Sequence, residues 1–107
     1  MERSGQADQV ATVVIRARLR GDTASAQQVH DQVTAATREQ ALAAGDLSHR
    51  TFLNPQDPME FLGIDEWRSA EASAAFAANP QIAEFFGRLF EGPPKVTVWV
   101  NSGWNEW

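Results

Sequence analysis

The residues that could do chemistry gather in the stretch FLGIDEW, residues 61–67. If this stretch is a β-strand, Phe61, Gly63, Asp65 and Trp67 share one face, because successive side chains point to opposite faces. A carboxylate that faces an apolar pocket is costly to keep ionised, which would make Asp65 a candidate general base. A tryptophan at a strand end can form one wall for a flat aromatic ligand while its N–H donates a hydrogen bond.

Both residues also have ordinary interpretations. Trp67 could fill the hydrophobic core, which is the commonest role of a tryptophan. Asp65 could pair with a nearby cation or contact water. Strand pairing in a β-sheet could place Arg16, Arg18 or Arg50 near it. Alternation alone does not decide which face of residues 61–67 meets the rest of the protein.

The two histidines are the other candidates for proton chemistry. His49 lies in LSHRTF, a predicted strand, and a histidine can shuttle protons near neutral pH. Its alternative role is an exposed or simply hydrogen-bonded side chain. His30 has polar neighbours in a predicted helix, so we expect it at the surface. The two histidines lack metal-ligand spacing, so no metal site is predicted.

Bulk composition excludes several classes of function. The 107 residues are enough for one domain. A net charge of −5 without any Lys/Arg block argues against a nucleic-acid partner. The absence of cysteine excludes disulfides and thiolate metal sites, and it fits a reducing compartment. No apolar run reaches the length of a membrane span, and the polar start lacks a signal-peptide core. We therefore expect a cytoplasmic protein that is not bound to a membrane.

The hydrophobic pattern divides the chain into seven elements. It predicts strands at residues 9–19, 47–54, 59–67 and 95–100. It predicts helices at residues 24–45, 70–79 and 81–90. Pro80 separates the last two helices, and residues 54–58, with two prolines, form a hairpin loop. Residues 1–8 are expected to be a flexible tail, residues 9–100 one domain, and residues 101–107 a C-terminal tail.

The first helix carries a predicted apolar stripe, and Gln40 lies on it as a polar interruption. The apolar members of that stripe are Ala26, Val29, Val33, Ala36 and Ala43.

The order strand, helix, strand, strand, helix, strand predicts an α+β fold of the ferredoxin-like βαββαβ type. Its antiparallel sheet would carry helices on one face. Because the chain has nothing left to cover the other face, we expect a homodimer whose two sheets pack face to face, a dimeric α+β barrel.

Three stretches resemble the antibiotic biosynthesis monooxygenase-like family, which has this dimeric barrel, over about residues 10–100. GDLSHRTFLNPQDP resembles the family's glycine, strand and hairpin, and FLGIDEWRSAEASAAF resembles its strand ending in tryptophan followed by a capped helix. ANPQIAEFFGRLFEGPP carries the family's proline at Pro80 and a proline pair before the last strand. The resemblance implies that the Trp67 face lines a pocket beneath the helices.

The resemblance also implies a function, with departures at three positions. Family members include oxygenases that use neither metal nor flavin, haem-degrading enzymes, isomerases of small sugar phosphates and proteins without known activity. Phe85 stands where the haem-degrading members place a ligand histidine, so haem is not expected. Gly63 replaces an asparagine of the polyketide oxygenases, and Phe76 replaces a frequent histidine. The pocket should therefore be more apolar than in many relatives.

These observations favour a cofactor-independent monooxygenase that acts on a small phenolic or quinol substrate. Asp65 or His49 would be the catalytic base, and no cofactor would be needed. The residues expected to hold the aromatic ring are Trp67, Phe61, Phe76 and Phe85. The alternative is a non-catalytic dimeric module that binds a small apolar ligand or a partner. A third possibility, an isomerase or lyase, would need a phosphate-binding cluster that the sequence does not show.

Overall fold

The alternating and helical patterns are realised as four strands and three helices within residues 9–107, the part of the chain that the computed structural model describes. The strands are β1 (Ala11–Arg18), β2 (Asp46–Asn54), β3 (Asp57–Trp67) and β4 (Lys95–Val100). The helices are α2 (Thr23–Ala44), α3 (Ala70–Ala77) and α4 (Pro80–Leu89). The predicted tail at residues 1–8 lies outside the described residues.

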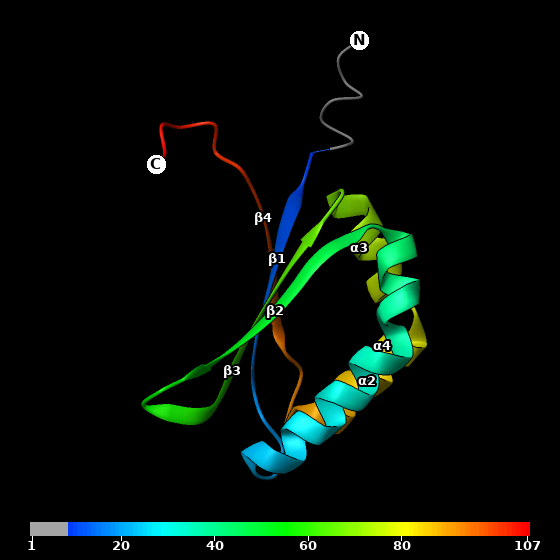
Figure 1. The fold of residues 1–107 in the computed structure, drawn as a ribbon, viewed down its shortest axis with the longest axis vertical. Coiled ribbons are helices and arrows are strands. Elements are labelled where there is room, and N and C mark those ends of the chain that lie inside the picture. The colour runs from blue at the N-terminus through cyan, green and yellow to red at the C-terminus, as the bar shows by residue number, and fades with distance from the viewer. Residues whose placement is uncertain (1–8) are drawn as a thin grey trace.

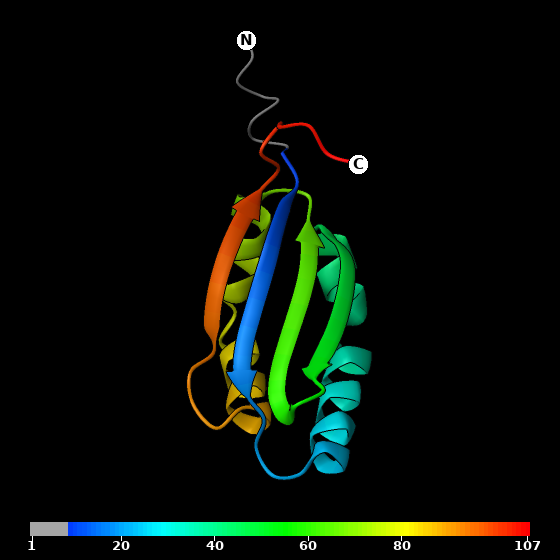
Figure 2. The same ribbon diagram turned by 90° about the vertical axis from the view of Figure 1, so that its left-hand side faces the viewer.

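The strands form one antiparallel sheet in the order β2-β3-β1-β4. All three helices lie on the same side of this sheet (Figure 1). Turning the molecule shows the opposite side of the sheet facing the viewer, with the helices behind it (Figure 2). The predicted ferredoxin-like α+β fold is confirmed, with the second helix of the βαββαβ order divided into α3 and α4.

The register fixes which residues face the helices. On the central strands Val13 lies opposite Asp65, Ile15 opposite Gly63 and Ala11 opposite Trp67. Trp67 is only 5% exposed, and its ring packs on Phe76 of α3. The face that carries Trp67 is therefore the one under the helices, as the resemblance implied. The buried core continues beside it with Leu19, Ala26, Phe61, Leu89 and Phe90.

Helix α2 has a clear start and end. The Asp22 side chain accepts a hydrogen bond from the Ser25 backbone N–H, which satisfies one of the free donors of the first turn. Gly45 ends the helix with φ of 118°, a left-handed conformation that suits glycine. The Gly45 carbonyl also accepts from the Arg68 N–H, which ties the helix end to the end of β3.

The predicted inner stripe of α2 is wrong in its second half. Ala36, Gln40 and Ala43 are exposed, whereas Thr37 is buried. Thr37 can face inward because its hydroxyl donates to the Val33 carbonyl at 2.8 Å and so keeps its polar group satisfied. A prediction that assigns only apolar residues to the inner face of the helix misses a buried threonine such as Thr37.

The break between α3 and α4 follows the sequence prediction. Ser69 caps α3 by accepting from the Ala72 N–H, and Asn79 caps α4 by accepting from the Gln81 N–H. Pro80 occupies the first turn of α4, where its missing N–H costs nothing.

The sheet face away from the helices carries apolar side chains that nothing within residues 9–107 covers. Val14, Leu62 and Ile64 are half-buried there, and Phe52 and Trp99 are exposed. Residues 101–107 form no helix or strand and are exposed. Among the described helices, none is both long enough and apolar enough to cross a membrane.

Candidate functional site

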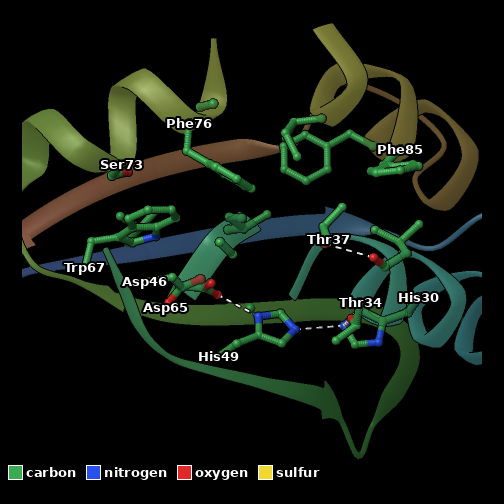
Figure 3. A pocket seen from close by; sticks show the side chains of 18 of the residues that line it. His30, Thr34, Thr37, Asp46, His49, Asp65, Trp67, Ser73, Phe76 and Phe85 are labelled. Atoms are coloured by element: carbon green, nitrogen blue, oxygen red, sulfur yellow. Dashed lines mark hydrogen bonds and ion pairs between the residues drawn. The ribbon is translucent and has the colours of Figure 1, made fainter. Parts of the chain in front are cut away.

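A cavity of about 490 Å³ lies between the sheet and the three helices. The cavity has an aromatic side and a polar side (Figure 3). On the aromatic side the rings of Trp67 and Phe76 have centroids 5.3 Å apart and are tilted by 44°. Phe85 of α4 lies on the same side, with Ser73 of α3 nearby (Figure 3).

The structure brings together every residue that the sequence placed in the site. Asp65, His49, Trp67, Phe61, Phe76 and Phe85 all line this one cavity. The rings of Phe76 and Phe85 form its wall and do not fill it. Phe61 is buried, 7% exposed, and its ring also packs on Phe90 at a centroid distance of 5.2 Å.

His49 and Asp65 form a hydrogen-bonded pair across the two neighbouring strands β2 and β3. The sheet register sets them directly opposite each other, and His49 Nδ1 lies 2.8 Å from Asp65 Oδ1. The Asp65 side chain is 14% exposed and that of His49 is 38% exposed. The hydrogen bond to Asp65 raises the pKa of His49 above its usual 6.5, against the opposing effect of burial.

None of the three arginines considered for Asp65 is its partner. Arg16 pairs with Glu60 and Arg18 with Asp57, each at 2.8 Å and near the hairpin end of β3. The guanidinium of Arg50 lies over the ring of Phe52, 5.1 Å from its centroid. Arg50 and its partner lie on the sheet face away from the cavity, because Arg50 pairs with Ile64 rather than with Asp65.

The prediction that His30 lies apart at the surface is wrong. His30 reaches from α2 into the cavity, its side chain is 20% exposed, and its Nε2 lies 2.9 Å from Nε2 of His49. The two rings are nearly parallel, with 15° between their planes, and they meet through their Nε2 edges (Figure 3). The Nδ1 atom of His30 lies 3.0 Å from Asp31 Oδ1. Spacing in the sequence did not show that α2 would lay His30 against β2.

These contacts indicate which ring nitrogens carry a proton. An ionised carboxylate only accepts hydrogen bonds, so each Nδ1 that faces Asp31 or Asp65 carries a proton. The contact between the two Nε2 atoms needs one more proton, held by either ring.

Asp46 is a second cavity residue that the sequence analysis missed. The strand β2 begins at Asp46, and a register shift between Asp46 and Ser48 sets Asp46 opposite Trp67. Such a bulge re-aims side chains, and here it turns Asp46 toward the cavity beside Asp65 (Figure 3). Asp46 is only 8% exposed. Burial, reinforced by the hydrogen bond with Asp65 and by its charge, raises the pKa of Asp46 to about 8.

Gly63 leaves room that a neighbouring ring takes up. A Cβ atom added at Gly63 would lie 3.1 Å from the Cε1 atom of Phe61 and 3.8 Å from Cβ of Ile15. The space of the asparagine expected from the resemblance is therefore taken by the Phe61 ring. This cavity has no amide at that position, and its polar side is made by carboxyl and imidazole groups instead.

A second hollow lies on the other side of His30. Its volume is about 440 Å³, and His30, Phe61 and Leu89 line both spaces. Asp31, the partner of His30, lines the second hollow and has a side chain 63% exposed. Within residues 9–107, no group of three or more His, Asp or Glu side chains is arranged to hold a metal ion.

The fold of this chain matches those of solved structures at low sequence identity. SnoaB, a cofactor-independent oxygenase from Streptomyces nogalater, is similar with a TM-score of 0.70 and 18% identity over 87% of this chain and 93% of its own. A conserved protein from Methanosarcina mazei reaches 0.68 with 11% identity, covering 92% and 99% of the two chains. A putative antibiotic biosynthesis monooxygenase from Nitrosomonas europaea reaches 0.66 with 13% identity, covering 90% and 93%.

No protein of curated function matches this chain. At these identities the solved structures establish the fold alone. The family is established by a separate match, because the sequence model of the antibiotic biosynthesis monooxygenases fits residues 12–88, which is most of the chain. The protein therefore belongs to the antibiotic biosynthesis monooxygenase family.

Proposed function

We propose that this protein is a cofactor-independent monooxygenase that acts on a small phenolic or quinol substrate. The observation that carries the proposal is the His49–Asp65 pair, held at 2.8 Å on the polar side of an aromatic-walled cavity of about 490 Å³. A cavity of that volume suits one small ring system. The family and the likeness to SnoaB support the same reaction class.

The proposed reaction needs only a base, dioxygen and exclusion of water. Loss of the phenol proton leaves an electron-rich anion, which gives one electron to O₂. The resulting radical and superoxide join at the ring carbon para to the hydroxyl, and a returning proton makes the hydroperoxide. Loss of the remaining hydrogen at that carbon breaks the O–O bond and releases water. The balance is one phenol and one O₂ consumed, one quinone and one water formed.

The side chains have separate roles in this scheme. The His49–Asp65 pair takes the proton and returns it to the peroxide, and the hydrogen bond keeps the imidazole oriented. Trp67 and Phe76 contact one face of the ring, and Phe61 and Phe85 close the apolar walls. An apolar lining also keeps water from the anion before it meets O₂.

Oxygen uptake tests this proposal. A panel of phenols, naphthols and quinols, including 1,5-dihydroxynaphthalene, is incubated with the protein and ¹⁸O₂. Mass spectrometry then measures the masses of the products. We expect uptake above the protein-free rate, with one labelled oxygen in each quinone and the other in water. Binding of these compounds without uptake would support the alternative, a ligand-binding module, which the apolar lining also favours.

We further propose that the protein is a homodimer. The uncovered sheet face presents Val14, Leu62 and Ile64 at its centre and the larger rings of Phe52 and Trp99 around them. A second copy turned by a two-fold axis would bury the same apolar face on both chains. This packing would complete the dimeric α+β barrel expected from the sequence.

A further inference from the structure

We propose that Asp46 is an additional catalytic residue, a neutral carboxylic acid that accepts the hydrogen bond of the substrate hydroxyl and relays its proton to Asp65. The inference rests on the proposed function, because it takes a phenol-type hydroxyl as the ligand group. It adds to that function the side chain of the protein that accepts a hydrogen bond from the substrate hydroxyl.

The first support is the placement of Asp46. The bulge at the start of β2 puts its side chain on the cavity face, beside Asp65 and opposite Trp67 in the register (Figure 3). With 8% exposure the carboxyl has little contact with water. A carboxyl at this position is costly to ionise unless a cation or several donors face it.

The second support is an unmatched acceptor. Asp46 Oδ1 is buried and has no hydrogen-bond partner among residues 9–107. Buried acceptors of this kind are rare and call for an explanation. The carboxyl lies beside that of Asp65 (Figure 3), and two adjacent carboxyls in a buried site are not both ionised without a large cost, which favours a proton on one of them. The shifted titration of Asp46 agrees with Asp46 as the holder, since its pKa is raised to about 8.

The third support is that the other titratable groups of the cavity are already engaged. His49 uses Nδ1 for Asp65 and Nε2 for His30, and His30 uses its second nitrogen for Asp31. Asp65 accepts from His49 and lies beside Asp46 (Figure 3). The remaining charged residue of the lining is Arg38 of α2. The parts of β1, β4, α3 and α4 that line the cavity contribute no charged group.

The proton route follows from these bonds. The substrate hydroxyl donates to Asp46 Oδ1, and its proton moves to that oxygen as the phenolate forms. At the same time the proton of the Asp46 carboxyl passes to Asp65, so Asp46 stays neutral and Asp65 becomes neutral. Reversal of both transfers returns the proton to the peroxide.

Two substitutions at Asp46 separate its two roles. Asp46→Asn keeps an acceptor oxygen and a donor to Asp65 but cannot relay a proton. Asp46→Leu removes the acceptor and keeps the same branched shape. Glu84→Gln, at an exposed carboxylate of α4, is the matched control. Folding of each variant is checked by its thermal unfolding and by near-ultraviolet circular dichroism.

Three measurements are made on the full chain. The infrared carbonyl band of a neutral carboxylic acid should be present at pH 7 in the native protein and in Glu84→Gln, and missing in Asp46→Asn. The native protein and Asp46→Asn should bind 1-naphthol at least tenfold more tightly than naphthalene, and Asp46→Leu should lose that preference. With an active substrate, kcat of Asp46→Asn should fall by about 10²–10⁴-fold while KM changes little.

Absence of the neutral-acid band from the native protein at pH 7 would overturn the inference. The same holds if Asp46→Leu still prefers 1-naphthol, or if Asp46→Asn turns over at the native rate. If the native protein oxidises no phenol in the panel, the proposed monooxygenase function is wrong, but this result alone does not decide the role of Asp46. The infrared and binding measurements then still decide whether Asp46 is the neutral acid that receives a hydroxyl ligand.

Discussion

His49 and His30 lie 19 residues apart in the chain and meet at 2.9 Å between their Nε2 atoms. The contact joins the helix α2 to the strand β2 inside the cavity. Each Nδ1 faces a carboxylate, so both nitrogens of each ring have a polar partner. His30 thus acts as a positioning residue, since its contact with Nε2 of His49 helps to fix how the His49 ring is turned.

Replacing His30 by phenylalanine should release His49 from this arrangement. The variant His30→Phe keeps a ring of comparable size but removes the Nε2 partner. The ¹⁵N chemical shift of His49 Nε2 should differ between the variant and the native protein, because that nitrogen loses its partner. We expect kcat to fall about tenfold with KM nearly unchanged, because the base is misoriented but still present. An unchanged ¹⁵N shift of His49 Nε2 in the variant would contradict the contact between the two rings.

Asp46 and His49 should make the protein less stable as pH rises through neutrality. Between its unfolded pKa of 3.8 and its folded value of about 8, Asp46 binds a proton in the folded state and not in the unfolded one, so stability falls with pH. His49, whose pKa is raised from 6.5, adds a loss of the same sign above that value.

Denaturant unfolding at pH 4.5 to 8.5 measures how the unfolding free energy changes with pH. The total loss of unfolding free energy over this range should be a few kcal/mol, since one unit of pKa corresponds to about 1.4 kcal/mol. Asp46→Asn should remove most of the slope, and Glu84→Gln should leave it unchanged. A native protein whose unfolding free energy is flat or rises over this range would contradict the protonated state of Asp46.

Two glycines should respond to alanine in opposite directions. At Gly63 the new Cβ would meet the ring of Phe61 at 3.1 Å, so Gly63→Ala must push that buried ring and should destabilise the fold by about 1–3 kcal/mol. At Gly87, in α4, no atom lies within 4 Å of the new Cβ, and Gly87→Ala should stabilise the fold by about 0.5–1 kcal/mol. Chemical denaturation of the two variants checks both signs. Equal effects would mean that the Phe61 ring does not rest on Gly63 as described.

The proposed dimer depends on the uncovered face of the sheet. Ile64→Asp places a charge at its centre and should convert the dimer to monomers, because an unpaired charge in an apolar interface is costly to desolvate. Ala75→Asp, at an exposed position of α3, is the control. Sedimentation equilibrium gives the mass of each protein. A native protein that sediments as a monomer at micromolar concentration would rule out the dimer.

The strand that carries the site was predictable because a period of two is a strong local signal. The alternation in residues 61–67 correctly placed Phe61, Asp65 and Trp67 on one face, and the family resemblance indicated which face meets the helices. The break between α3 and α4 was predictable for the same reason, because the proline that causes it is a local signal in the sequence.

The missed residues depended on tertiary structure. His30 stands among polar neighbours, and its place in the cavity follows from how α2 crosses β2, which no local pattern encodes. Asp46 directly follows the glycine that ends α2, and the bulge that turns it inward is a property of the pairing of β2 with β3. The order Gly45-Asp46 before a strand was the only available signal for it.

The account depends most on the His49–Asp65 pair acting as one base on a bound phenol. The direct measurement is steady-state oxygen uptake, with the best substrate of the panel, by the native protein, His49→Gln, Asp65→Asn and the double variant. We predict that each single change lowers kcat by about 10²–10⁴-fold and that the double variant is little slower than either, because residues that act as a unit are not additive. Uptake unchanged in both single variants, with their folds intact, would contradict the account.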